Sequence, residues 1–109
     1  MNWADKLPMP LTICDNEGII LYMNPASIES FSKDGGSNLI GTNLLDCHPE
    51  PSKSQLKKML DEQTGHTYSV EKNGKKKIIH EVPWYKNGKF AGLMEISIHL
   101  PENMKVIKK

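Results

Sequence analysis

The stretch DNEGIILYMNPA, at residues 15–26, decides how the first part of the chain folds. Its opening DNEG is a tight-turn signal, because Asp, Asn and Gly tolerate positive φ. Leu11 and Ile13 lie before this turn and an apolar run follows it, so the segment predicts a β-hairpin. Pro25 has no amide hydrogen and should end the second strand near Asn24. A second stretch, GTNLLDCHPE at residues 41–50, begins with glycine and ends at a proline-containing corner.

The rest of the chain predicts helices first and strands afterwards. Residues 26–31 and 39–45 are expected to form short helical pieces, and Ser52 is a plausible N-cap for a longer helix. An apolar stripe at positions i, i+3 and i+4 should face the core from that helix; it consists of Leu56, Met59 and Leu60. From residue 66 polar and apolar residues alternate, and turns are expected at KNGK, residues 72–75, and at Asn87-Gly88. This pattern predicts three antiparallel strands and an α+β layout.

Length and composition set the broad class. With 109 residues, 38% of them hydrophobic, the chain fits one domain with a modest core. Its apolar runs are too short to cross a bilayer, and its amino terminus lacks a signal-peptide pattern. We therefore expect no membrane association and a cytoplasmic location. The two cysteines do not make a disulfide framework.

Charge does not select a nucleic-acid partner. The net charge is +1, and all fourteen basic residues are lysines. Bidentate recognition of phosphate and guanine relies mainly on arginine, so nucleic-acid binding is not expected. The lysine run at residues 75–77 is better explained as a solvated hairpin tip that resists edge-to-edge pairing.

These elements, in this order, resemble a PAS domain over nearly the whole chain. The matching residues are Asp15 and Gly18, the segment YMNPA at 22–26, Gly41, and the pair Gly88 and Gly92. The resemblance implies an α+β PAS fold with about five antiparallel strands, short helices and one longer helix packed on one face. It also implies an N-terminal segment (1–10), a PAS domain (11–100) and an exit tail (101–109).

The same resemblance implies a sensory module of signal transduction and argues against an enzyme. Such a module binds a small-molecule ligand in an internal pocket and forms a homodimer or contacts a signalling partner. The alternative is an interaction domain with a filled core and no ligand. No nucleophile elbow, paired-carboxylate site, phosphate-binding glycine loop or zinc-ligand spacing stands out in the sequence.

Two narrower comparisons refine this expectation. DCHPEPSKSQLKKML and KKIIHEVPWYKNGKFAGLMEIS are similar to PAS modules attached to hemerythrin-like domains in anaerobic microbes. The pattern of flavin photosensors is not matched, because Leu44 stands where their reactive cysteine follows the Gly-x-Asn element, so flavin–cysteinyl photochemistry is not expected. Cys47 lies near the anchor of a coumarate-binding relative, but Ser27 stands near the place of the partner acid.

Histidines are the candidates for binding a cofactor. Heme-binding PAS domains hold iron through a histidine near the pocket helix, and His48 lies just before that helix, so heme is a candidate cofactor and His48 its candidate metal ligand. The alternative is that His48 braces the proline corner through a backbone hydrogen bond. His80 and His66 lie on apolar strand faces, where a histidine is either a ligand or a hydrogen-bonded core residue.

Strand alternation assigns the two faces of the predicted sheet. The side chains expected to face the pocket, besides the histidines, are Met23, Leu56, Met59, Leu60, Val82, Met94 and Ile96. The opposite face would expose Ile79, Pro83, Tyr85 and Leu93, more apolar surface than a lone monomer usually leaves. A homodimer through that face, covered in part by the segment with Trp3, is therefore expected.

Overall fold

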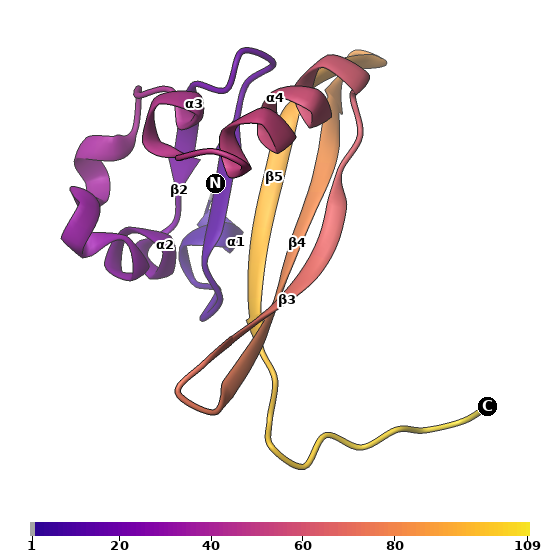
Figure 1. The fold of residues 1–109 in the computed structure, drawn as a ribbon. Helices are drawn as coiled ribbons and strands as arrows, with labels where there is room; N and C mark the ends of the chain where they lie inside the picture. The colour runs from indigo at the N-terminus through magenta and orange to yellow at the C-terminus, as the bar shows by residue number, and fades with distance from the viewer. Residues whose placement is uncertain (1) are drawn as a thin grey trace.

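The computed structural model describes residues 2–109 and contains a five-stranded antiparallel sheet in the order β2-β1-β5-β4-β3. The last three strands follow one another along the chain and pair as a meander, as the alternating pattern predicts (Figure 1). The strands are β1 (Leu11–Cys14), β2 (Ile20–Met23), β3 (His66–Lys72), β4 (Lys75–Lys86) and β5 (Lys89–His99).

The helical segments that connect β2 to β3 along the chain lie on one face of the sheet (Figure 1). Two 3₁₀ turns follow the first of these helices. The segments are α2 (Pro25–Ser30), η1 (Ser32–Asp34), η2 (Gly36–Leu39), α3 (Leu44–Cys47) and α4 (Ser52–Glu62). Together with the five strands they make the α+β PAS architecture that the sequence predicts.

Asn24 joins the first hairpin to the helices that flank it. Its side chain is fully buried and caps α2, because Oδ1 accepts a hydrogen bond of 2.9 Å from the amide of Ser27. The same oxygen accepts the amide of Leu11 at 2.9 Å, while Nδ2 donates to the carbonyls of Ala4 and Met9. One amide therefore holds four backbone groups from before β1, the start of β1 and the start of α2.

A short N-terminal helix, α1 (Asn2–Asp5), packs on the side of the sheet away from α4. Ala4 is fully buried, and the Tyr22 hydroxyl hydrogen-bonds Asp5. Tyr22 pairs with Ile13 in the sheet, so both side chains lie on the face opposite the cavity-lining Met23. We call this the outer face, and the face that carries α4 the inner face.

Helix α4 covers the inner face with the stripe that the sequence predicts. Leu56, Met59 and Leu60 are all buried, and they form a cluster with Cys14 and Leu93. Burial of such side chains stabilises a fold by about 1.5 to 3 kcal/mol each. The expected N-cap is wrong, since Ser52 is the first helical residue; Pro51 precedes it without a side-chain cap, and the Glu50 carboxylate instead accepts the amide of Ser54 at 2.8 Å.

The assignment of β4 and β5 side chains to the two faces is wrong by one residue throughout. The inner face carries Ile79, Glu81, Leu93 and Glu95, whereas Val82 pairs with Met94 on the outer face. Shifting the assignment by one residue moves every side chain of a strand to the other face, and the more apolar of the two faces is not the one that α4 covers. It is instead the face that α1 partly covers.

At Gly92 the backbone of β5 passes very close to the end of β1. A Cβ atom built on Gly92 would lie 2.0 Å from the carbonyl oxygen of Cys14, so only glycine permits this approach. Trp84 pairs with Gly92, and its indole Nε1 donates a 2.9 Å hydrogen bond to the same carbonyl. The bond ties β4 to β1 across the backbone of β5.

The ends of the chain differ in how they pack. Residues 2–5 join the fold through α1, whereas residues 101–109 form neither helix nor strand and are exposed. None of the helices within residues 2–109 has the length and apolar character that crossing a membrane requires.

We expect Asn24→Ala to lower the free energy of unfolding by about 3 kcal/mol, because it removes a helix cap and leaves buried backbone groups without partners. Urea denaturation of the variant and the wild-type chain measures the difference. Asn43→Ala is the matched control, since Asn43 caps the short α3, donates to one further group, the carbonyl of Glu17, and is less buried. Equal losses for the two variants would contradict the role of Asn24.

Candidate ligand-binding cavity

A cavity of about 570 Å³ lies between the inner face of the sheet and the helical layer. Its wall is mostly apolar, as ligand cavities in proteins usually are. The apolar and sulfur-containing lining residues are Cys14, Ile20, Met23, Phe31, Leu39, Leu44, Cys47, Leu56, Val70, Ile79 and Leu93. The polar ones are Thr12, Asp34, His48, Tyr68, Lys77, Glu81 and Glu95. A second hollow of about 360 Å³ shares several of these residues and adds Met59 and His66.

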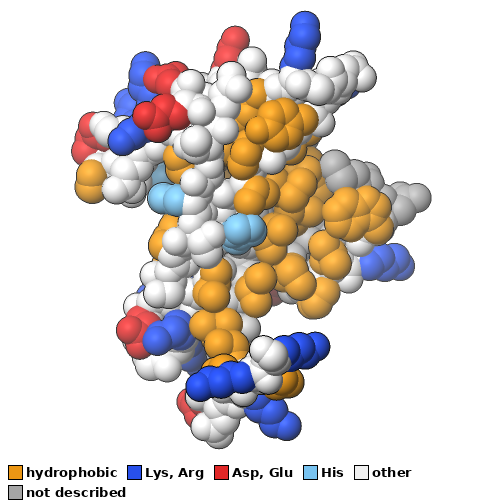
Figure 2. Space-filling view, turned by 90° about the vertical axis from the view of Figure 1, so that its right-hand side faces the viewer, with side chains coloured by type: hydrophobic (Ala, Val, Ile, Leu, Met, Phe, Trp, Pro, Cys, Tyr) orange, Lys and Arg blue, Asp and Glu red, His pale blue; other side chains and the backbone are white. Residues whose placement is uncertain are grey.

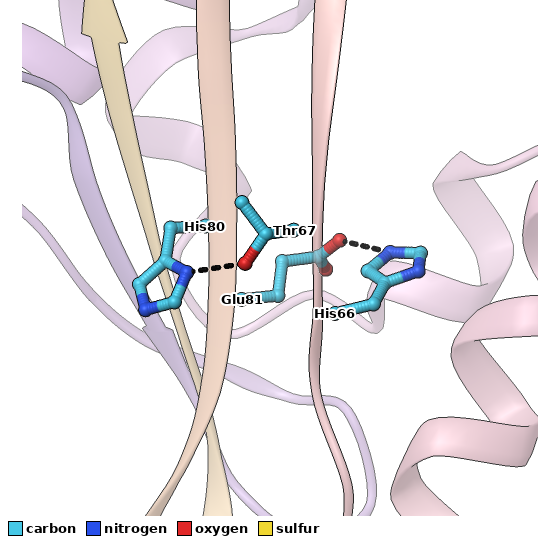
Figure 3. Close-up of polar contacts among 4 residues, drawn as sticks. All are labelled: His66, Thr67, His80 and Glu81. Carbon is cyan, nitrogen blue, oxygen red and sulfur yellow. Dashed lines mark hydrogen bonds and ion pairs between the residues drawn. The ribbon is translucent and has the colours of Figure 1, made fainter. Parts of the chain in front are cut away.

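Two glutamates give the cavity its distinctive chemistry. Glu81 on β4 and Glu95 on β5 are directly paired in the sheet, and both line the cavity. Directly opposite residues in an antiparallel pair have Cβ atoms about 5 Å apart, so their charges repel at short range. Glu81 is only 9% exposed, and its Oε1 lies 2.8 Å from Nε2 of His66 (Figure 3).

Glu95 has a strongly shifted pKa. Burial, followed by the negative charge of Glu81, raises the pKa of Glu95 to about 7, and Lys77 opposes the rise. Burial likewise raises the pKa of Tyr68, also on the cavity wall, to about 12. Titratable groups perturbed in this way cluster at functional sites.

His48 lines the cavity and also braces its own corner. Its Nδ1 lies 2.7 Å from the carbonyl oxygen of Leu44, so Nδ1 carries the proton and donates it. That arrangement leaves Nε2 of a neutral ring with a free lone pair, as a metal-binding histidine requires. The two interpretations left open by the sequence are therefore compatible, because the brace uses one ring nitrogen and leaves the other.

The remaining predicted ligand-binding residues divide into two groups. Met23 and Leu56 line the main cavity, Met59 lines the adjoining hollow, and Leu60 is buried in the core cluster behind them. His80, Met94 and Ile96 are excluded from the cavity, because their strand positions place them on the outer face. His80 instead contacts the Thr67 hydroxyl through Nδ1 at 2.6 Å, on the opposite side of the strands from the His66–Glu81 pair (Figure 3).

The predicted interface residues are corrected for the same reason. Ile79 and Leu93 are 6% and 4% exposed and line the cavity, so they are unavailable to a partner. Pro83 lies on the same inner face and is half-buried. Tyr85 and Trp3 are exposed, and the Tyr85 ring packs edge-on against Phe90.

Sequence reasoning missed Glu81, Glu95, Lys77 and Tyr68 as cavity residues. Glu81, Glu95 and Lys77 lie on the inner face of β4 and β5, which the apolar pattern assigned to solvent, whereas Tyr68 shares the inner face of β3 with His66. The available signal was a glutamate in the middle of each of two apolar strands that a hairpin brings together. Two glutamates directly opposite each other destabilise a sheet, because like charges repel. Their presence in paired strands is therefore a signal of something other than stability.

An antiparallel sheet of this order, with helices and a cavity on one face, is the fold of a PAS-type domain. The chain belongs to the PAS-fold family: the family model described as "PAS fold" matches residues 4–102. None of the curated proteins matches the chain.

Solved structures agree with the family assignment at the level of the fold. The Aer2 receptor from Vibrio cholerae, described as a dual PAS-heme oxygen sensor, has a TM-score of 0.64 and 19% identity; the match covers 85% of this chain and 95% of that one. A sensory box sensor histidine kinase from Vibrio cholerae has a TM-score of 0.66 and 19% identity, with 92% and 88% covered. The PAS domain of Bordetella pertussis BvgS has a TM-score of 0.67 and 18% identity, with 93% and 83% covered.

The raised pKa of Glu95 predicts how stability depends on pH. The folded chain holds the Glu95 proton more tightly than the unfolded chain, so this contribution is fully present below about pH 4.5 and is lost as pH rises through about 7. We expect Glu95→Gln to match the wild type at pH 4 and to be roughly 2 to 3 kcal/mol more stable at pH 8.

Urea denaturation from pH 4 to pH 9 measures the difference between the two free energies of unfolding. Glu102→Gln, in the exposed tail, is the control and should show no pH-dependent difference. A difference between Glu95→Gln and wild type that stays constant across this range would contradict the assignment.

Proposed function

We propose that this PAS domain is a sensory module that binds a small molecule in the 570 Å³ cavity and signals its occupancy through the outer face of the sheet. The cavity is the observation that carries the proposal. An apolar space of this volume beside a pair of carboxylates departs from the close packing of ordinary protein interiors. Ligand binding acts by shifting the population of two arrangements of the domain.

Heme is the second candidate ligand, and His48 is the residue that favours it. A bound heme would supply an iron centre able to bind a diatomic gas, with Nε2 of His48 as its protein ligand. The carboxylates of Asp34, Glu81 and Glu95 on the wall oppose the heme propionates, and Lys77 is the cation available to pair with them. This charge balance ranks heme behind a small organic ligand.

The outer face supplies a surface for a homodimer or a signalling partner. Figure 2 shows hydrophobic side chains gathered over the strands on the side away from α4. Ile78, Val82, Trp84, Met94 and Ile96 are half-buried there, and Ile98 is 41% exposed. A patch this apolar marks an interaction site. The alternative function, an interaction domain without a ligand, uses the same surface and leaves the cavity without a role.

The relation to hemerythrin-associated PAS modules remains a prediction from the sequence. It would place the sensed ligand in an anaerobic setting, and neither the cavity nor the outer face depends on it. We likewise propose a cytoplasmic location, as the sequence predicts.

Adjacent isoleucines on β4 allow a matched test of ligand binding. Ile79 faces the cavity and Ile78 faces the other way. We expect native mass spectrometry of freshly purified protein to show a bound small molecule in the wild type and in Ile78→Trp. Ile79→Trp should lose it, because the indole occupies the cavity.

The same spectra separate the two candidate ligands. Heme would be identified by its mass and Soret absorbance, and His48→Ala would remove it while leaving an organic ligand bound. Retention of the molecule by Ile79→Trp, or no bound molecule in the wild type after incubation with cell metabolites, would contradict the proposal and favour the ligand-free alternative.

Self-association is tested by introducing a charge into the outer face. We expect Ile98→Asp to weaken the dimer at least about tenfold, because an interface must desolvate the new carboxylate. Ile40→Asp is the matched control: Ile40 is 42% exposed, nearly the same as Ile98, but follows η2 in the helical layer. Sedimentation velocity over a range of concentrations gives the dissociation constants. Equal effects of the two substitutions, or a monomeric wild type, would rule out this dimer.

A further inference from the structure

The chemical class of the ligand can be argued from the charges that face the cavity. Glu81 and Glu95 are brought together by the register of β4 and β5, and both side chains line the cavity, where Glu81 is buried and Glu95 half-buried. Glu81 has a partner, since its Oε1 lies 2.8 Å from Nε2 of His66. Among the described residues, the Glu95 side chain makes no hydrogen bond or ion pair.

Glu95 is half-buried, and a partly desolvated carboxylate without a protein partner is costly to ionise. It must either take up a proton or meet a positive charge, because desolvation penalises the ionised form. Glu95 lines both the main cavity and the adjoining hollow, so the accessible part of its side chain faces a space that a ligand can enter. The charge of a cationic ligand would therefore be stabilised next to Glu95, inside the cavity.

The other charged and titratable groups around the cavity do not supply enough positive charge. Lys77 from β4 is the one lysine on the wall, and it faces three carboxylates, those of Asp34, Glu81 and Glu95. Its charge favours ionisation of Glu95, but burial and Glu81 outweigh it. The remaining groups on the wall are thiols, a phenol and an imidazole, contributed by Cys14, Cys47, Tyr68 and His48.

The rest of the wall fits an organic cation better than a bare metal ion. No group of three histidine, cysteine, aspartate or glutamate side chains within the described chain is arranged to hold a metal. The wall instead offers aliphatic side chains and the rings of Phe31 and Tyr68. Aromatic rings attract ammonium groups, and aliphatic side chains bury the hydrocarbon part of an amine.

We propose that the cavity recognises a small organic cation, a protonated amine or quaternary ammonium with an apolar body, and that Glu95 and Glu81 pair with its charge. This inference rests on the proposed ligand-binding function and specifies the ligand. Glu95 makes the direct ion pair, and His66 holds Glu81 in place from the edge strand β3.

Three probes of similar size but different charge test the inference. They are phenyltrimethylammonium, its neutral isostere tert-butylbenzene, and benzenesulfonate, none of which titrates near neutral pH. Binding is followed by amide chemical shifts of the ¹⁵N-labelled protein, which also locate each probe at the cavity. We expect the cation to bind at least about tenfold more tightly than the neutral isostere at pH 8, and the sulfonate to bind least.

The affinity for the cation should also depend on pH. Binding requires ionised Glu95, so the affinity at pH 6 should be about tenfold lower than at pH 8. Glu95→Gln should remove both the preference for the cation and the pH dependence, whereas Glu102→Gln in the exposed tail should keep both. The amide side chain is close in size to the carboxylate, so the variant retains the shape of the cavity.

The outcomes separate this inference from the proposed function. Equal or tighter binding of the neutral or anionic probe, or a cation preference that survives in Glu95→Gln, would overturn the cationic ligand while ligand binding itself stands. Failure of all three probes would also overturn it. The proposed function fails separately, if the native mass spectra additionally show no bound molecule of any charge.

Discussion

The fully buried side chain of Asn24 bonds backbone groups of three segments at once, and the position of the helical layer depends on it. It ends the first hairpin, starts α2 and holds the carbonyls of Ala4 and Met9. A side-chain amide suits this position because it has both an acceptor oxygen and two donor hydrogens. The chain therefore leaves β2 in one direction only, and the helices that follow are directed over the inner face of the sheet.

That direction gives the two faces of the sheet different surroundings. A cavity remains between the helices and the inner face, and Glu81 and Glu95 lie side by side in its wall. The outer face receives only the short α1, and most of its apolar side chains remain partly exposed. The inner face thus carries more carboxylates than lysines around its cavity, and the outer face carries partly exposed apolar side chains.

The fold could be predicted from the sequence, because its decisive signals are local. The turn at Asp15, the proline after Asn24 and the stripe Leu56, Met59 and Leu60 each act within a few residues, and the structure contains all of them. The cavity could be predicted only in part. His48, Met23 and Leu56 are placed by their neighbours in the sequence, and they do line it.

The strand residues of the cavity could not be predicted with the rule that the more apolar face lies inside. β4 carries Ile78, Val82 and Trp84 on one face and Ile79 with Glu81 on the other, so hydrophobicity favours the wrong face. A binding cavity tolerates charge that a packed core does not, and an interaction surface tolerates apolar residues that a solvated one does not. An error of one residue in the strand assignment therefore placed residues of the cavity wall in the predicted interface, and residues of the outer face in the predicted cavity.

The contact of Trp84 with Cys14 has a mechanical consequence. Cys14 is part of the cavity wall, while the indole that donates to its carbonyl belongs to a residue of the outer face, and Gly92 puts no side chain between them. A guest that displaced β1 by a fraction of an ångström would stretch or realign this bond directly. Occupation of the cavity would then change the position of an outer-face side chain through this one hydrogen bond, without any rearrangement of the helices.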